Sequence, residues 1–83
     1  MFYVYILQSQ KDSSYYIGYS SNPTLRLEKH NRAKTGYTAR KQPWTLLYTE
    51  AFEEKSEAIK RERFIKAQKS KVFIDKLIRE NKS

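Results

Sequence analysis

The stretch from Phe2 to Leu7, FYVYIL, decides how this chain folds, because every position in it carries a large apolar or aromatic side chain. Such residues favour a β-strand, and a run without polar positions is typical of a strand that is buried on both faces of a sheet. Successive side chains of a strand point to opposite faces. The stretch therefore predicts a buried strand with other elements packed on each side of it.

A second strand is predicted over Tyr15–Ser20, YYIGYS, after the polar, turn-like segment Gln8–Ser14. The short polar link between the two strands predicts an antiparallel hairpin. Gly18 lies in the middle of the second strand, where glycine weakens pairing. It therefore indicates close approach of another backbone or of a ligand.

The rest of the chain predicts helices and one further strand. Ser21-Asn22-Pro23 marks a helix start, because Ser or Asn caps free amide groups and Pro is accepted at the first helical position. The predicted elements are a helix over 23–32, a basic loop over 33–43, a strand over 44–52, a helix over 53–68 and a last helix that is capped by Ser70 and has Val72, Phe73, Leu77 and Ile78 on its apolar side. This β-β-α-β-α-α order predicts one α+β domain over residues 1–83, while spacing alone leaves the place of the third strand open.

The charge predicts an anionic partner. The chain of 83 residues carries 17 Lys or Arg and 9 Asp or Glu, a formal charge of +8. Nucleic acid is favoured, ahead of an acidic protein or a membrane surface. The absence of cysteine excludes disulfides and thiol catalysis, and one histidine excludes a His cluster. No apolar run approaches the roughly 20 residues that span a bilayer, and Met1–Gln10 lack a basic signal-peptide region, so a cytoplasmic protein is expected.

A carboxylate falls inside the apolar stripe of the helix predicted over 53–68. At 3.6 residues per turn, Glu62 lies between Ala58, Ile59 and Ile65 rather than on the basic outer face. Burying a bare carboxylate is costly, so Glu62 requires water, a cation or a metal ion. Two interpretations stay open: a boundary Glu that reaches water or pairs with an arginine, and a functional carboxylate.

Two further groups of residues are candidates for chemistry. Arg26 and His30 are four apart and share a helix face, where Arg binds phosphate and His transfers protons near neutral pH. Five of the seven tyrosines lie between Tyr3 and Tyr19. A surface Arg with a backbone-bonded His, and tyrosines that only stabilise strand pairs, are the structural alternatives.

The ordered motifs resemble those of the GIY-YIG nuclease superfamily, in particular its small single-domain bacterial branch. Tyr16-Ile17-Gly18 matches the second motif literally, whereas Tyr3-Val4-Tyr5 has Tyr where the first motif has Gly and Val where it has Ile. Ten residues separate Tyr5 from Tyr16, which fits the family spacing. The resemblance covers nearly the whole chain and continues through NPTLRLEKHN at 22–31, Tyr37-Thr38, Pro43-Trp44-Thr45-Leu46, Glu57-Ala58 with Glu62, and Ile65-Lys66.

The resemblance implies a three-stranded antiparallel sheet flanked by helices and a metal-dependent endonuclease that hydrolyses DNA, in DNA repair or other nucleic-acid processing. Tyr5 and Tyr16 would line the cleft, one of them as general base or water-orienting group. Arg26 would hold the scissile phosphate, and His30 would assist in proton transfer or phosphate positioning. Glu62 would be the protein ligand of one Mg²⁺ or Mn²⁺ ion. A single carboxylate ligand suits Mg²⁺, because this ion keeps several waters and takes few protein ligands.

Basic residues next to these positions are expected to follow the nucleic-acid backbone. Six basic residues and one acid lie between Arg26 and Lys41, and Tyr37 and Trp44 would offer stacking faces for unpaired bases. DNA is favoured over RNA. The residues expected to bind nucleic acid are Arg26, Lys29, Arg32, Lys34, Tyr37, Arg40, Lys41 and Lys66.

Two other functions stay open. The degenerate first motif is compatible with a nucleic-acid-binding module of the same fold that has weak or no turnover. A protein-interaction domain is the third possibility. Because one domain is expected, the choice of substrate would then come from a partner chain.

Overall fold

The structure is a computed structural model that describes residues 1–80; the last three residues of the expected domain, 81–83, lie outside this part. Its elements are β1 (Phe2–Ser9), β2 (Tyr15–Ser20), α1 (Pro23–Arg32), α2 (Tyr37–Arg40), β3 (Trp44–Phe52), α3 (Lys55–Ala67) and α4 (Lys71–Glu80). The predicted α+β fold class is confirmed, and the predicted elements follow one another in the predicted order, with α2 as an additional helix. The prediction of an unbroken loop over 33–43 is wrong, because α2 forms a single helical turn there, too short to produce a periodic pattern.

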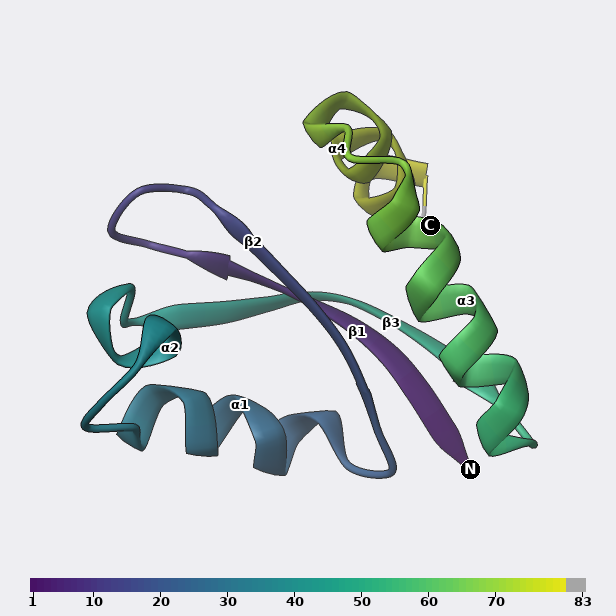
Figure 1. Cartoon of the computed structure of the whole chain (residues 1–83), viewed down its shortest axis with the longest axis horizontal. Coiled ribbons are helices and arrows are strands. Elements are labelled where there is room, and N and C mark those ends of the chain that lie inside the picture. The colour runs from purple at the N-terminus through teal and green to yellow at the C-terminus, as the bar shows by residue number, and fades with distance from the viewer. Residues whose placement is uncertain (81–83) are drawn as a thin grey trace.

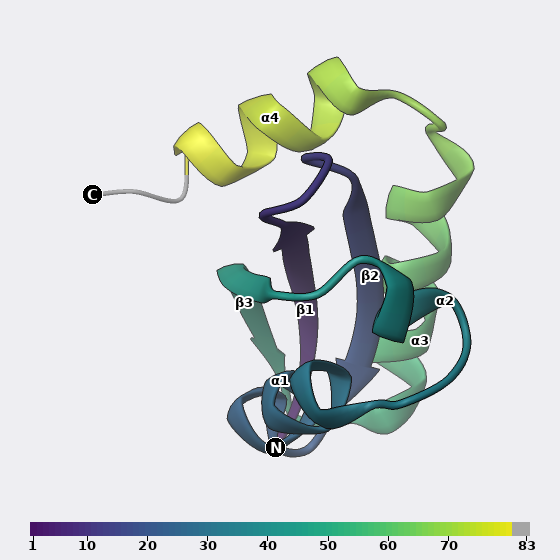
Figure 2. The ribbon, with the colours of Figure 1, turned by 90° about the vertical axis from the view of Figure 1, so that its left-hand side faces the viewer.

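The sheet has the order β2-β1-β3 with both pairs antiparallel, so the FYVYIL strand is central (Figures 1 and 2). Val4, Tyr5, Ile6 and Leu7 are all 0 % exposed, as predicted for a strand buried on both faces. The third strand, whose place the spacing left open, pairs with the other side of β1. β2 and β3 are therefore the two edges of the sheet.

Helices cover both faces of this sheet. Val4 and Ile6 pack against α3 and α4, while Tyr5 and Leu7 form a second cluster with Trp44 and with Leu27 of α1. The predicted apolar side of the last helix is wrong at one position, because Val72 is 75 % exposed. The buried residues of α4 are Ile78, as predicted, and Ile74, one helical turn earlier, which was not predicted.

Local caps fix where the helices begin and hence where the candidate residues lie. Asn22 Oδ1 accepts a hydrogen bond from the Leu25 amide at 3.1 Å and Pro23 follows at the first helical position, as predicted. Ser70 Oγ accepts from the Phe73 amide at 3.1 Å, which confirms the predicted cap of α4. α3 begins at Lys55 rather than at residue 53, because Glu54 and Glu57 form a capping box there.

Candidate active site

Tyr5 and Gly18 lie directly opposite each other in the β1–β2 pairing. A Cβ atom on Gly18 would lie 2.6 Å from the Tyr5 Oη and 2.7 Å from its Cζ, distances that atoms in contact do not adopt. The predicted close approach at Gly18 is therefore made by a side chain, not by a backbone or a ligand. Because Gly18 has no side chain, the phenol of the fully buried Tyr5 has room to extend across β2.

This crossing brings the phenol into a cavity of about 360 Å³ at the β2 edge, between α1 and α3. Four of the predicted site residues line the cavity, each from a different element: Tyr5 from β1, Tyr16 from β2, Arg26 from α1 and Glu62 from α3. Residues that are far apart in the sequence thus meet at one place. We call this space the active-site cavity.

His30, the fifth predicted residue, lies behind the lining. Its Nε2 is 3.3 Å from the Tyr5 Oη, within hydrogen-bonding distance, and its ring centroid is 4.6 Å from that of Tyr16. The four-residue spacing of Arg26 and His30 places both against the same phenol, because they occupy one face of α1. Arg26 is solvent-exposed on this helix.

Burial and the Arg26 charge oppose each other at Tyr5 and act together at His30. Burial raises the pKa of the Tyr5 phenol above 10.0, while the neighbouring Arg26 guanidinium opposes this rise. Burial, and then Arg26, lower the pKa of His30 below 6.5. At neutral pH the imidazole is therefore uncharged and able to accept a proton, and the phenol retains its own.

Since the chain has one histidine, the pKa of His30 is directly measurable. We expect an NMR titration of the imidazole to give a midpoint below 6.5, with the stability contributed by the neutral ring present above pH 6.5 and lost as pH falls through the folded pKa. In Arg26→Gln the midpoint should rise but stay below 6.5, because burial is the larger cause. A wild-type midpoint at or above 6.5 would contradict this environment.

The Glu62 side chain is 13 % exposed, consistent with the apolar stripe in which the sequence places it. Its partner is Lys66, whose Nζ is 3.6 Å from Oε2, rather than the arginine considered from the sequence. Within residues 1–80, Oε1 forms no hydrogen bond, and no group of three or more His, Cys, Asp or Glu is placed to hold a metal ion. One carboxylate facing a polar cavity fits Mg²⁺, which completes its shell with water and phosphate oxygens.

The residues expected to bind nucleic acid occupy several environments. Lys29, Arg32, Lys34 and Arg40 are exposed. Tyr37 is 46 % exposed, so its ring is accessible. Lys41 forms an ion pair with Asp12 and lies 5.2 Å from the Tyr37 ring centroid.

Trp44 does not offer the expected stacking face. The side chain is 3 % exposed in the cluster with Tyr5 and Leu7, and its Nε1 donates to the Thr38 carbonyl at 2.9 Å. The strand position of Trp44 points its ring into the sheet face that α1 covers. The expectation that Trp44 stacks on bases is therefore wrong.

Lys55 is a cavity residue that sequence reasoning missed. It lies at the first position of α3 and lines the cavity together with Glu62. The two are seven residues apart, which is two helical turns and hence one face, and this spacing was the available signal. The other lining residues not predicted from the sequence are Phe2, Tyr19, Ser20 and Ser21.

This fold and cavity define a class of protein. Residues 1–76 match the GIY-YIG catalytic domain, and the chain belongs to this family, which is a family of nucleases. The family is generally metal-dependent and acts on nucleic acid. Among residues 1–80, no helix has the length and apolar character that crossing a membrane requires.

Within the family, the chain is similar to the small UPF0213 proteins. A UPF0213 protein of Staphylococcus haemolyticus and one of Staphylococcus aureus are each 46 % identical to it over 65 residues, which are 77 % of this chain and 78 % of each relative. The solution NMR structure of the UPF0213 protein BH0048 from Bacillus halodurans is 35 % identical, with a TM-score of 0.62 over 98 % of this chain and 86 % of that one. These relatives support the family and the fold, and their names give no specific activity.

Proposed function

We propose that this chain is a metal-dependent endonuclease that hydrolyses phosphodiester bonds in DNA, in DNA repair or other nucleic-acid processing. The observation that carries the proposal is the convergence of Tyr5, Tyr16, Arg26 and Glu62 on one cavity from four separate elements. Phosphodiester hydrolysis requires an activated water, positive charge on the phosphoryl oxygens and support for the leaving oxygen. In the proposed site, Tyr5 with His30 would activate the water and Arg26 would supply the positive charge. A divalent ion held by Glu62 would support the leaving oxygen.

Tyr5 and His30 form the proton-accepting part of the proposed site. The phenol orients the attacking water and hydrogen-bonds through Oη to His30 Nε2 at 3.3 Å. Because the imidazole is neutral at pH 7, it is able to take the phenolic proton as the phenol takes one from water. Tyr16, stacked 6.4 Å from Tyr5 between ring centroids, limits the positions that this water occupies.

Arg26 and Lys55 supply fixed positive charge at the phosphate. The guanidinium of Arg26 presents a planar pair of donors to the scissile phosphate and balances the charge that develops on it. Glu62 would hold a divalent ion, and the ion would supply Lewis-acid stabilisation of the phosphoryl and leaving oxygens. Lys66 balances the Glu62 charge in the absence of an ion.

The proposal is tested by incubating the purified protein with plasmid, single-stranded and branched DNA, with Mg²⁺, with Mn²⁺ and with EDTA. We expect metal-dependent cleavage of at least one substrate and none with EDTA. Single-stranded and branched RNA of the same sequences should be cut more slowly than the corresponding DNA. Equal background cleavage with and without metal on every substrate would overturn the proposal.

A second candidate is a nucleic-acid-binding module without useful turnover. Two observations favour it: the Glu62 carboxylate is already paired with a lysine, and Tyr5 retains its proton at neutral pH. Such a module would bind DNA with steep salt dependence and show no metal-dependent cleavage. The incubation described above separates the two candidates.

A further inference from the structure

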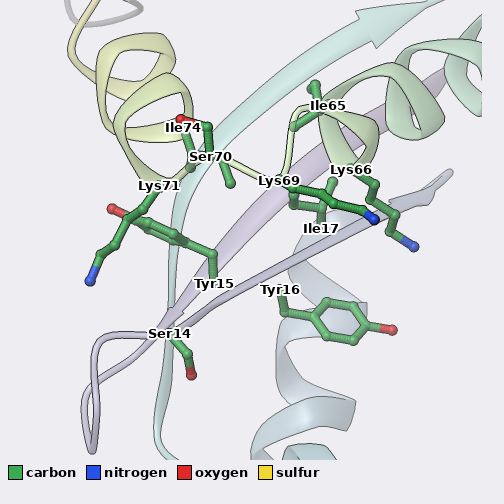
Figure 3. A pocket seen from close by; sticks show the side chains of 10 residues that line it. All are labelled: Ser14, Tyr15, Tyr16, Ile17, Ile65, Lys66, Lys69, Ser70, Lys71 and Ile74. Atoms are coloured by element: carbon green, nitrogen blue, oxygen red, sulfur yellow. The ribbon is translucent and has the colours of Figure 1, made fainter.

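A second cavity adjoins the active site. It encloses about 450 Å³ between the β2 edge and the turn that joins α3 to α4, and Figure 3 shows the side chains around it. Tyr16 lines both spaces, and the Glu62–Lys66 ion pair joins a residue of one to a residue of the other. We call this space the β2-edge groove.

Three lysines and no carboxylate line the β2-edge groove: Lys66, Lys69 and Lys71. In the part of the chain that the structure describes, Lys69 and Lys71 form no ion pair, and the Lys66 side chain is 54 % exposed. Figure 3 shows the ammonium ends of Lys66 and Lys69 extending in the same direction as the Tyr16 hydroxyl. Two neighbouring cations on one side of a cavity favour a phosphate there.

Lys69 also has an uncommon backbone conformation. Its φ is +46°, in the left-handed region just beyond the end of α3, and its amide donates to the Lys66 carbonyl at 3.2 Å. Glycine is the usual residue at such a position, because a Cβ atom is strained there. A lysine at this position is strained relative to glycine, and a role for its charge would explain why lysine is present there.

The floor of the groove is apolar. Ile17 from β2 and Ile74 from α4 form it, above Ile65 of α3, which is 0 % exposed. The ring of Tyr15 lies beside them under the Lys71 ammonium at 5.8 Å. Phosphate makes no use of such a surface, whereas the face of a sugar or base does. In a duplex the base faces are stacked on each other, so only an unpaired nucleotide is able to present one. The volume suits a ligand of about this size.

We propose that the β2-edge groove holds an unpaired nucleotide next to the cleaved bond, with its phosphate on Lys66 and Lys69 and its base over the isoleucine floor. This rests on the proposed nuclease function and names its substrate class. That class is DNA with a single-stranded segment beside the cleavage point, such as a flap, a gap or a free single strand.

Lys69→Gly tests the groove without endangering the fold, because it removes the charge and the left-handed strain together. Binding is measured by fluorescence anisotropy, without divalent ions, on a short fluorescein-labelled single-stranded deoxyoligonucleotide and on the blunt duplex of the same sequence. We expect single-strand binding to weaken by about fivefold, with the log–log salt slope flatter by about 0.7. Duplex binding should change by less than about twofold, and the melting temperature should equal or exceed that of the wild type.

Lys60→Ala is the matched control, since it removes one charge from an exposed position of α3 that lines neither cavity. It should leave both affinities within about twofold of wild type. Equal effects of Lys69→Gly and Lys60→Ala, or equal weakening of single-strand and duplex binding by Lys69→Gly, would overturn the groove proposal even if the protein cuts DNA. Selective loss of single-strand binding in a protein that never cuts would support the groove and overturn the nuclease proposal.

Discussion

Glu62→Gln is expected to lower metal-dependent cleavage of DNA by about a thousandfold or more, because the amide keeps the shape of the carboxylate but loses the charge that attracts a divalent ion. DNA binding without metal should stay the same or tighten, since an anion leaves the cavity and Lys66 is released from its pair. Single-turnover cleavage and anisotropy binding on the same substrate measure the two effects separately.

Glu28→Gln provides the control for this change. It makes the same substitution at an exposed position of α1 outside the cavity and should leave the cleavage rate within about twofold of the wild type. Metal-dependent cleavage that survives Glu62→Gln at the wild-type rate would exclude Glu62 as the metal-binding carboxylate, and the nuclease site would have to lie elsewhere.

Gly18→Ala is expected to have the second large effect, although it adds one methyl group. That group would lie 2.6 Å from the Tyr5 Oη, and the phenol has little room to withdraw because Tyr5 is 0 % exposed and packs with Leu7 and Trp44. Overpacking of this kind destabilises by about 1–3 kcal/mol. We expect urea denaturation to show this loss and cleavage to fall by about a hundredfold, because the phenol leaves its place beside His30.

A double-mutant cycle with Tyr5→Leu identifies the cause. Tyr5→Leu alone should be destabilising, because it leaves a cavity in the second cluster, and adding Gly18→Ala to it should cost much less than Gly18→Ala costs in the wild type. The double variant should recover stability relative to the sum of the single changes but recover no cleavage. Additive losses of stability would show that Gly18 is required for a reason unrelated to the phenol.

The course of the chain was largely predictable because its signals are local. The apolar FYVYIL run predicts the central strand, and Asn22-Pro23 and Ser70 mark helix starts through short-range capping bonds that the structure contains. Features that depend on distant contacts were not predictable in this way. Tertiary packing determines that β3 pairs with β1 and that the Val72 side chain is exposed. No short window of sequence encodes this packing.

The meeting of the candidate residues was predictable for a different reason. The two tyrosine motifs, the Arg-His pair and the inward glutamate each indicated chemistry only weakly, and the family resemblance supplied the arrangement that joins them. Lys55 and Lys69 were missed because a lysine among 17 basic residues carries no signal by itself. In the structure, Lys55 is identified by its place in the wall of the active-site cavity, and Lys69 by its positive φ.

The position of β2 at the edge of the sheet has a consequence for solubility. An edge strand has peptide groups without strand partners, and such edges allow other chains to add on and aggregate. Here Lys66 of α3, Lys69 of the α3–α4 turn and Lys71 of α4 line the groove at that edge, and every copy of the chain carries a formal charge of +8. The same charges that would receive a phosphate oppose the approach of a second molecule of the protein. An edge with this charge would admit a polyanion and oppose self-association.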